Sequence, residues 1–127
     1  MPAPSARIYA ALIDADQFTR MTAFSMVKNA PPATIGRAPG EAFSLFGGQI
    51  VGRQIELASN SLIVQAWRDI GWPKGIYSIA RFELKESGGR TTIVFDHTGF
   101  PAGRGPHLAE GWHKNYWEPM TAFLAAK

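Results

Sequence analysis

Apolar residues at helical spacing open the chain. After Ser5, which is placed to act as an N-cap, apolar positions recur at intervals of three and four over residues 6–12 and predict a short helix that ends near Asp14. Asp14 is followed three residues later by Gln17, the spacing of a capping box, ahead of further apolar positions. The pattern therefore predicts two short helices at the start of the chain.

After residue 21 the chain changes to short runs of β-branched and aromatic residues separated by Gly, Pro, Asn and Ser, a texture typical of strands. Gly47-Gly48 is a two-residue hairpin signal, because glycine adopts a positive φ without steric cost. Successive strands with tight links predict an antiparallel meander. About six strands are expected from these signals, near Phe24–Asn29, Glu41–Phe46, Gln49–Leu57, Ser61–Arg68, Ile76–Lys85 and Arg90–Thr98.

Alternation along the later strands predicts which face of the sheet is buried. Ile93, Phe95 and His97 fall on one face of their strand, while Asp96 falls on the other. One face of the sheet is therefore expected to lie against the core. Gly52 lies inside a strand run, where glycine weakens pairing and often marks a bulge, so we expect the sheet to bend there.

The last part of the chain returns to helical spacing. Apolar residues at four-residue intervals predict one long helix over Leu108–Ala126. Pro119 lies inside this run and costs about 3 kcal/mol in a regular helix interior, so we expect a kink near Asn115 to Trp117, or a break into two segments. The apolar positions that would face the core are Leu108, Trp112, Tyr116, Met120 and Leu124.

Composition indicates one globular domain over residues 1–127, since 46% of the residues are hydrophobic and 18% are charged. The absence of cysteine excludes disulfides and thiolate metal sites and is consistent with a reducing cytoplasm. The N-terminus lacks the features of a secretory signal, and no run of residues approaches the roughly 18 apolar positions of a membrane span. The net charge of +3 comes from scattered positions, so nucleic-acid binding is not expected.

An ordered series of motifs resembles the activator of Hsp90 ATPase homologue family, within the START-like (SRPBCC) superfamily. The resemblance covers nearly the whole chain from Ser5 onward. It implies an α+β helix-grip fold, in which a curved antiparallel sheet of about six strands surrounds a long C-terminal helix and leaves a cavity between them. The motifs are the run Gly40–Gly48, Trp67-Arg68, Trp72-Pro73, the run Phe95–Pro101, Gly111-Trp112 and Tyr116-Trp117.

The chain departs from the family pattern at its beginning. Family members normally start with a strand before the first helix, whereas the helical pattern here begins almost at once. If the chain is complete, a strand of the sheet that is normally covered becomes an edge, and unpaired edges recruit partners. We therefore expect a homodimer or an exchanged element at that edge.

The cavity that the resemblance implies would be lined by aromatic residues, because the chain has four tryptophans and few charges. Filling the core is the commoner role of any one tryptophan, so both roles stay open. The loop Trp72–Gly75 is a further place where an exposed aromatic residue would meet a partner. The residues expected to contact a small hydrophobic ligand are Phe46, Trp67, Phe95, His97, Trp112, Tyr116 and Met120.

His97 is the candidate for chemistry. On the buried face of its strand, an imidazole has the position of an acid or base, although a half-buried histidine held by hydrogen bonds is the more common case. His107 and His113 have no further ligand at metal-binding spacing, so neither a metal nor a cofactor is expected. The chain also lacks a nucleophile elbow, a phosphate loop and a dinucleotide fingerprint.

Three functions follow from these observations. The first is non-catalytic binding of a small hydrophobic ligand between sheet and helix. The second, implied by the resemblance, is a partnership with an Hsp90-type chaperone whose ATPase the protein stimulates, although the separate N-terminal domain that normally anchors that activator is not found here. The third is an enzyme of the cyclase or hydratase kind that uses His97 as a proton shuttle. Fold class does not choose between them.

Overall fold

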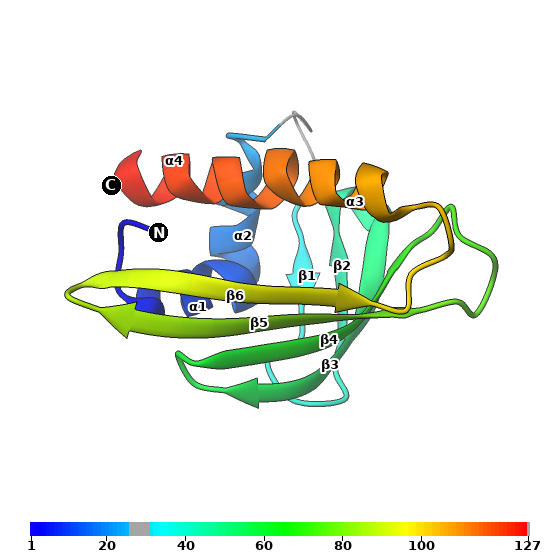
Figure 1. Cartoon of the computed structure of the whole chain (residues 1–127), viewed down its shortest axis with the longest axis horizontal. Helices are drawn as coiled ribbons and strands as arrows, with labels where there is room; N and C mark the ends of the chain where they lie inside the picture. Colours follow the sequence, from blue (N-terminus) through cyan, green and yellow to red (C-terminus); the bar gives the residue numbers. More distant parts are fainter. Residues whose placement is uncertain (26–30, 127) are drawn as a thin grey trace.

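Six strands form one antiparallel sheet in the computed structural model, which describes residues 1–25 and 31–126. Their order in the sheet equals their order along the chain, so the predicted meander is confirmed. The sheet curves strongly, as Figure 1 shows. The strands are β1 Thr34–Ile35, β2 Ala42–Leu45, β3 Ile50–Ala58, β4 Leu62–Asp69, β5 Ser78–Ser87 and β6 Arg90–Thr98.

The first predicted strand, Phe24–Asn29, is not seen where the structure describes it. Phe24 and Ser25 belong to turns that continue the preceding helix, since their N–H groups donate to the carbonyls of Met21 and Thr22. The rest of the predicted strand lies outside the described residues. The sheet begins instead at β1, a strand of two residues that is too short to show an alternating pattern.

The link between β2 and β3 is longer than the predicted two-residue turn. Leu45 pairs with Ile50, and a short 3₁₀ turn, η1 (Phe46–Gly48), followed by one further residue, connects the strands. Gly47 and Gly48 have φ values of 69° and 88°, so the glycine preference behind the prediction is confirmed although the turn type is not. The longer link matters because it brings the Phe46 side chain toward the core.

The irregularity of the sheet lies near Gly52 but not at it. Gly52 keeps regular pairing, whereas the register of β3 against β4 shifts between Gln54 and Glu56. Glycine is required at position 52 for a different reason. A Cβ there would lie 2.6 Å from Cζ of Phe43 and would also collide with the carbonyl oxygen of Ala66. Gly52 therefore permits a close approach of neighbouring strands and a ring.

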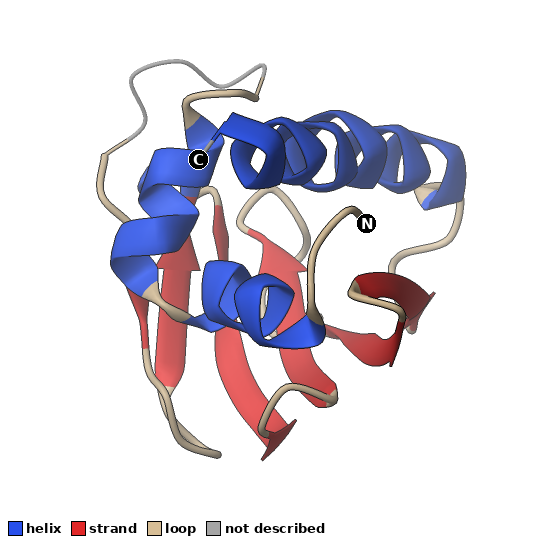
Figure 2. Cartoon of the chain, turned by 90° about the vertical axis from the view of Figure 1, so that its left-hand side faces the viewer, coloured by secondary structure: helices blue, strands red, loops and turns tan. Residues whose placement is uncertain are grey.

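Two short helices pack inside the curve of the sheet, together with the C-terminal helix (Figure 2). The Asp14 carboxylate accepts a hydrogen bond from the Gln17 N–H at 3.1 Å, which confirms the predicted cap of the second helix. The cap predicted for Ser5 is wrong: Pro4 holds the N-cap position, and the Ser5 hydroxyl donates to the Glu86 carboxylate at 3.0 Å. The helices are α1 (Ser5–Ile13) and α2 (Ala15–Thr22).

The C-terminal helix runs continuously across the sheet in three segments (Figure 1). The wide middle turn is π-helical, and the Glu118 N–H bonds to the His113 carbonyl five residues earlier. Pro119 explains this turn, because it lacks an N–H and its ring would collide with the Asn115 carbonyl in a regular α-helix. The predicted distortion is thus confirmed in place and takes the form of a wide turn. The segments are α3 (Gly105–Trp112), η2 (His113–Trp117) and α4 (Glu118–Ala126).

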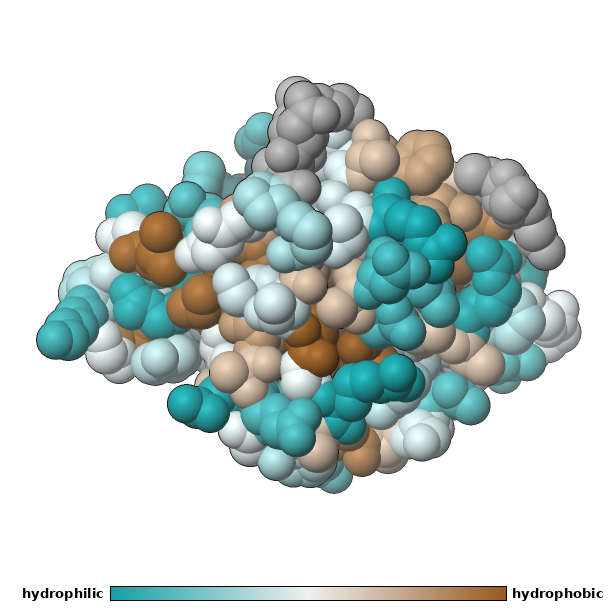
Figure 3. Space-filling model, turned by 180° about the vertical axis from the view of Figure 1, so that it is seen from behind, coloured by the Kyte–Doolittle hydropathy of each residue, from teal (hydrophilic) through white to brown (hydrophobic). Residues whose placement is uncertain are grey.

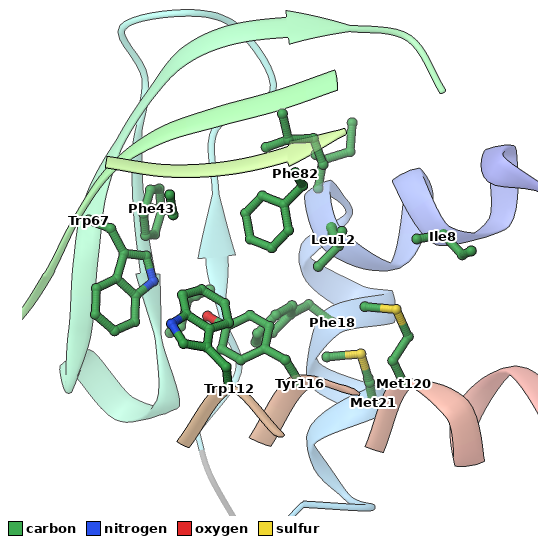
Figure 4. Close-up of a cluster of buried hydrophobic side chains, with 14 of the residues drawn as sticks. Ile8, Leu12, Phe18, Met21, Phe43, Trp67, Phe82, Trp112, Tyr116 and Met120 are labelled. Atoms are coloured by element: carbon green, nitrogen blue, oxygen red, sulfur yellow. The ribbon is translucent and has the colours of Figure 1, made fainter. Parts of the chain in front are cut away.

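One stripe of the C-terminal helix enters the core. All five residues predicted to face inward are buried, with exposed fractions of 7% or less. Figure 4 shows members of this stripe meeting side chains from α1, α2 and the sheet. Full burial of a large apolar side chain contributes about 1.5–3 kcal/mol, so this stripe is a major part of the driving force for docking the helix. In the described part of the chain, no helix has the length and apolar character needed to cross a membrane.

Strand β6 forms one edge of the sheet. At its start, Met1 and Thr91 exchange two backbone hydrogen bonds, of 2.7 and 3.1 Å, in the manner of an antiparallel pair. Every second residue of β6, counted from Thr91, points its backbone N–H and C=O groups away from β5. Over residues 1–25 and 31–126 no recorded backbone bond reaches the outer edge at Ile93, Phe95 or His97.

The dimer predicted from the sequence would use this edge. We expect multi-angle light scattering to give the mass of two chains at high concentration and a fall toward one chain on dilution, because added strand pairing satisfies the free edge. A mass of one chain at every concentration would contradict the prediction.

Candidate functional site

A cavity of about 140 Å³ lies between the C-terminal helix and the ends of β3 and β4. Its inner wall is aromatic, and its outer rim carries polar side chains. It is lined by Phe46, Gln49, Ile50, Trp67, Asp69, His107, Leu108, Gly111, Trp112, Asn115 and Tyr116.

Three buried aromatic residues form the inner wall. Trp67 comes from β4, and Trp112 and Tyr116 come from successive turns of the C-terminal helix (Figure 4). The Trp67 and Trp112 ring centroids lie 5.2 Å apart, and those of Trp112 and Tyr116 lie 4.1 Å apart. Phe46 adds an edge contact to Tyr116 at 6.0 Å. The wall is therefore rigid, since each ring packs on the next.

Polar atoms of this wall lack hydrogen-bond partners. The Trp67 indole Nε1, the Asn115 Oδ1 and the Tyr116 hydroxyl are all buried, and none makes a hydrogen bond of good geometry, although the Trp67 indole lies near enough to the Tyr116 hydroxyl to favour its ionised form. Burial raises the pKa of Tyr116 far above its ordinary value, and the adjacent Trp67 indole offsets only part of this effect. Buried polar groups are usually paired, so a cluster of unpaired ones beside a cavity points to a missing partner.

The rim of the cavity has a defined charge pattern. The Asp69 carboxylate accepts hydrogen bonds from the Gln49 amide at 2.7 Å and from the Gly71 N–H at 2.8 Å, which holds it in place. His107 also lies at the rim, and none of the lining residues is lysine or arginine. An anionic ligand would therefore meet a carboxylate and no permanent cation.

A helical glycine also borders the cavity. His107, Gly111 and Asn115 follow each other at four-residue spacing and form one ridge of the lining. A Cβ placed on Gly111 meets no atom within 4 Å, so packing does not require a glycine there. Glycine in a helix interior costs about 1 kcal/mol relative to alanine. Gly111 thus keeps space open at a cost in stability.

A second hollow, of about 310 Å³, lies on the other side of the helix, next to β6. His97 lies on its wall and is held at both ring nitrogens. The Trp112 indole N–H donates to Nδ1 at 3.0 Å, and Nε2 lies 2.6 Å from the Ser78 hydroxyl. The hollow is lined by Phe95, His97, Phe100, Gly105, Leu108, Ala109, Trp112 and Trp117.

The hydrogen bonds assign a structural role to His97. Because Nδ1 accepts from Trp112, the neutral ring carries its proton on Nε2 and donates to Ser78. Ser78 in turn donates to the Trp67 carbonyl at 3.0 Å. His97 therefore has no free lone pair with which to take a proton from Ser78. Burial also lowers the pKa of His97 to about 4, so the ring is neutral at physiological pH.

The structure divides the predicted ligand-contact residues among three places. Phe46, Trp67, Trp112 and Tyr116 line the 140 Å³ cavity. The second hollow takes Phe95 and His97, and it shares Trp112. Met120 is fully buried in the core and lies on neither wall (Figure 4). Their contact with a ligand stays a prediction.

Sequence reasoning missed the polar part of the cavity. Gln49 and Asp69 reach the rim from the ends of two strands, and their distance in sequence hid the connection. The ridge of His107, Gly111 and Asn115 was available from the four-residue spacing beside the apolar stripe. Among the residues that the structure describes, no group of three or more His, Cys, Asp or Glu side chains gathers as a metal site.

Comparison with known proteins gives the family. The family model of activator of Hsp90 ATPase homolog 1-like protein matches residues 2–125. The chain belongs to this family. The resemblance seen in the sequence motifs is thereby confirmed, and so is the helix-grip fold that it implied.

Curated relatives of this Hsp90-activator-homologue chain are longer proteins. An uncharacterised protein of Schizosaccharomyces pombe is 38% identical over 91% of the chain, which covers 32% of that protein. The mouse activator of 90 kDa heat shock protein ATPase homolog 2 is 28% identical over 73% of the chain and 28% of its own length. The chain thus spans 22–32% of the length of the curated relatives it matches.

Solved structures of other proteins share the fold. A crystal structure of an HSP90 activator from Plasmodium falciparum has a TM-score of 0.87 at 25% identity, and the match covers 97% of this chain and 89% of the crystallised chain. The protein CalU16 from Micromonospora echinospora has a TM-score of 0.77 at 18% identity, covering 97% and 70% of the two chains, and shows the fold alone.

The His97 network predicts a pH dependence of stability. In the unfolded chain His97 takes up a proton below about pH 6.5, whereas in the folded chain it does so only near pH 4. The free energy of unfolding is therefore expected to fall as pH drops from 6.5 to 4. Between pH 7 and pH 5, His97 should account for about 1 kcal/mol of this fall, after the effect is reduced for solvent screening at the partly exposed ring.

Urea unfolding at pH 7 and pH 5 tests this share. His97→Gln should shrink the difference in the free energy of unfolding between the two pH values, whereas His107→Gln, at an exposed position, should leave that difference unchanged. An equal pH dependence in the wild type and His97→Gln would show that the ring titrates alike in both states.

Proposed function

We propose that the chain is a non-catalytic domain that binds a small, mostly apolar molecule in the 140 Å³ cavity between the sheet and the C-terminal helix. The observation that carries the proposal is the space beside Gly111. A helix that could have been stabilised by any side chain with a Cβ keeps a glycine where a void is lined by aromatic rings.

The surroundings of the cavity support binding more than chemistry. The aromatic wall offers apolar area, the rim offers polar groups at one end, and this combination is typical of small-molecule sites. His97, the candidate acid or base, is engaged at both ring nitrogens and lies in the other hollow. The third hypothesis, an enzyme that uses His97, therefore receives no support from the geometry.

Two substitutions at Gly111 test the proposal. Gly111→Leu is expected to fill the cavity and abolish binding, whereas Gly111→Ala should raise stability by about 0.5–1 kcal/mol and retain binding, because a single methyl group takes little of the space.

Native mass spectrometry of protein purified from several expression hosts gives the readout. We expect a co-purifying small molecule on the wild type and on Gly111→Ala, and its loss in Gly111→Leu. Bare protein in all three variants from every host would overturn the proposal. Thermal unfolding of the same samples confirms that the leucine variant is folded.

A second candidate function is the partnership with an Hsp90-type chaperone. It is supported by the likeness to the crystallised chain of an HSP90 activator from Plasmodium falciparum, of which this chain covers 89%. The cytoplasmic location expected from the cysteine-free sequence goes with this proposal.

The surface offers one loop for such a contact. In the loop between β4 and β5, Trp72 is buried against Trp67, contrary to the expectation of an exposed ring there. Ile70, Ile76 and Tyr77 are exposed instead, at 54%, 40% and 50%. On the face seen in Figure 3, hydrophobic groups are separated by hydrophilic ones and do not form one large patch.

Stimulation of a cognate Hsp90 ATPase tests this second function. We expect the purified chain to raise the turnover of Hsp90, and Ile70→Ser with Tyr77→Ser to weaken this effect at least fivefold, because exposed apolar side chains gain most from burial in a contact. Ile55→Ser, at another exposed position, is the control. Unchanged Hsp90 turnover at saturating protein contradicts the proposal.

A further inference from the structure

The unpaired atoms of the cavity wall define what its ligand must offer. Trp67 Nε1 is only a donor, Asn115 Oδ1 is only an acceptor, and the Tyr116 hydroxyl is both. A purely apolar ligand would leave the Asn115 oxygen without a donor and the Tyr116 hydroxyl without an acceptor. A molecule that accepts one hydrogen bond and donates another at neighbouring atoms would pair with them after small side-chain rotations.

The volume of the cavity limits the size of the ligand. A cavity of about 150 Å³ in another protein accepts one benzene molecule. The present cavity, at about 140 Å³, therefore has room for a single six-membered ring and a small substituent that reaches toward the rim. A long acyl chain or a fused ring system would extend out of this space past the rim.

The charges around the cavity limit the charge of the ligand. The lining contains the Asp69 carboxylate and neither lysine nor arginine, so a carboxylate or phosphate would be desolvated without a cation. A cation would face the carboxylate at the rim but would meet the positive end of the Trp67 N–H deeper inside. Because burial keeps the Tyr116 hydroxyl protonated, it also adds no charge.

We propose that the cavity selects a neutral, single-ring molecule that carries a hydroxyl or primary amide group, with this group held among Trp67, Asn115 and Tyr116. The inference rests on the proposed function of ligand binding and adds the chemical class of the ligand.

A matched set of probes tests the class. Isothermal titration of the full chain uses benzene as the plain ring, phenol and benzamide as rings with the required hydroxyl or amide, benzoate as an anionic ring, and tetramethylammonium as a cation. We expect phenol or benzamide to bind at least tenfold more tightly than benzene, and benzoate at least tenfold more weakly than benzamide.

Variants identify the side chains that form hydrogen bonds with the ligand. Tyr116→Phe should reduce the preference for phenol over benzene at least fivefold, while the affinity for benzene changes by less than twofold. Asn115→Leu is a second variant that should reduce the preference for phenol over benzene in the same way. Tyr77→Phe, which removes an exposed hydroxyl outside the cavity, should leave both affinities unchanged.

The outcomes separate this inference from the proposal on which it rests. Benzene binding as tightly as both phenol and benzamide, or tighter binding of benzoate or tetramethylammonium, overturns the inferred class but supports a ligand cavity. The class is also overturned if none of the probes binds while a co-purifying molecule is lost in Gly111→Leu. If no probe binds and no molecule co-purifies, both the ligand-binding function and the inferred ligand class are contradicted.

Discussion

The packing of one ring, that of Trp112, is the contact on which the rest of this structure depends. Its centroid lies 4.4 Å from Phe95 and 5.2 Å from Trp67, so it joins the C-terminal helix to two strands at once. Its N–H reaches His97 at 3.0 Å. Trp112 lines both hollows, one on each side of the helix, and therefore acts as the partition between them. Without this contact the helix would lose an anchor that reaches two strands, and the cavity would lose part of its inner wall.

The two sides of the partition differ in how their polar groups are satisfied. On the β6 side, Trp112, His97, Ser78 and the Trp67 backbone carbonyl form a continuous chain of hydrogen bonds. On the other side, Asn115 and Tyr116 carry buried polar atoms that lack partners. A satisfied network makes a core rigid, whereas unpaired groups are costly and call for a partner from outside the chain. This difference indicates a structural role for the β6 side and a binding role for the side that holds the 140 Å³ cavity.

Family membership settles the architecture but leaves function to the residues of the site. The same helix-grip arrangement accommodates many roles, and the chain covers 22–28% of the length of the curated activator homologues that it matches. The ligand and chaperone proposals use separate parts of the surface, since the exposed loop residues Ile70 and Tyr77 do not line the cavity. The two functions are therefore physically compatible in one domain.

Local patterns in the sequence determined the antiparallel meander, the cap at Asp14, the buried stripe of the last helix and the place where Pro119 distorts it, because neighbours in sequence produce each of these features. Four of the expected ligand-contact residues also reached the cavity. Only the tertiary structure decided the partner of Ser5, which is 81 residues away, the place of the bulge, and the polar rim at Asp69. These features arise where distant segments meet, and side-chain periodicity carries no information about such meetings.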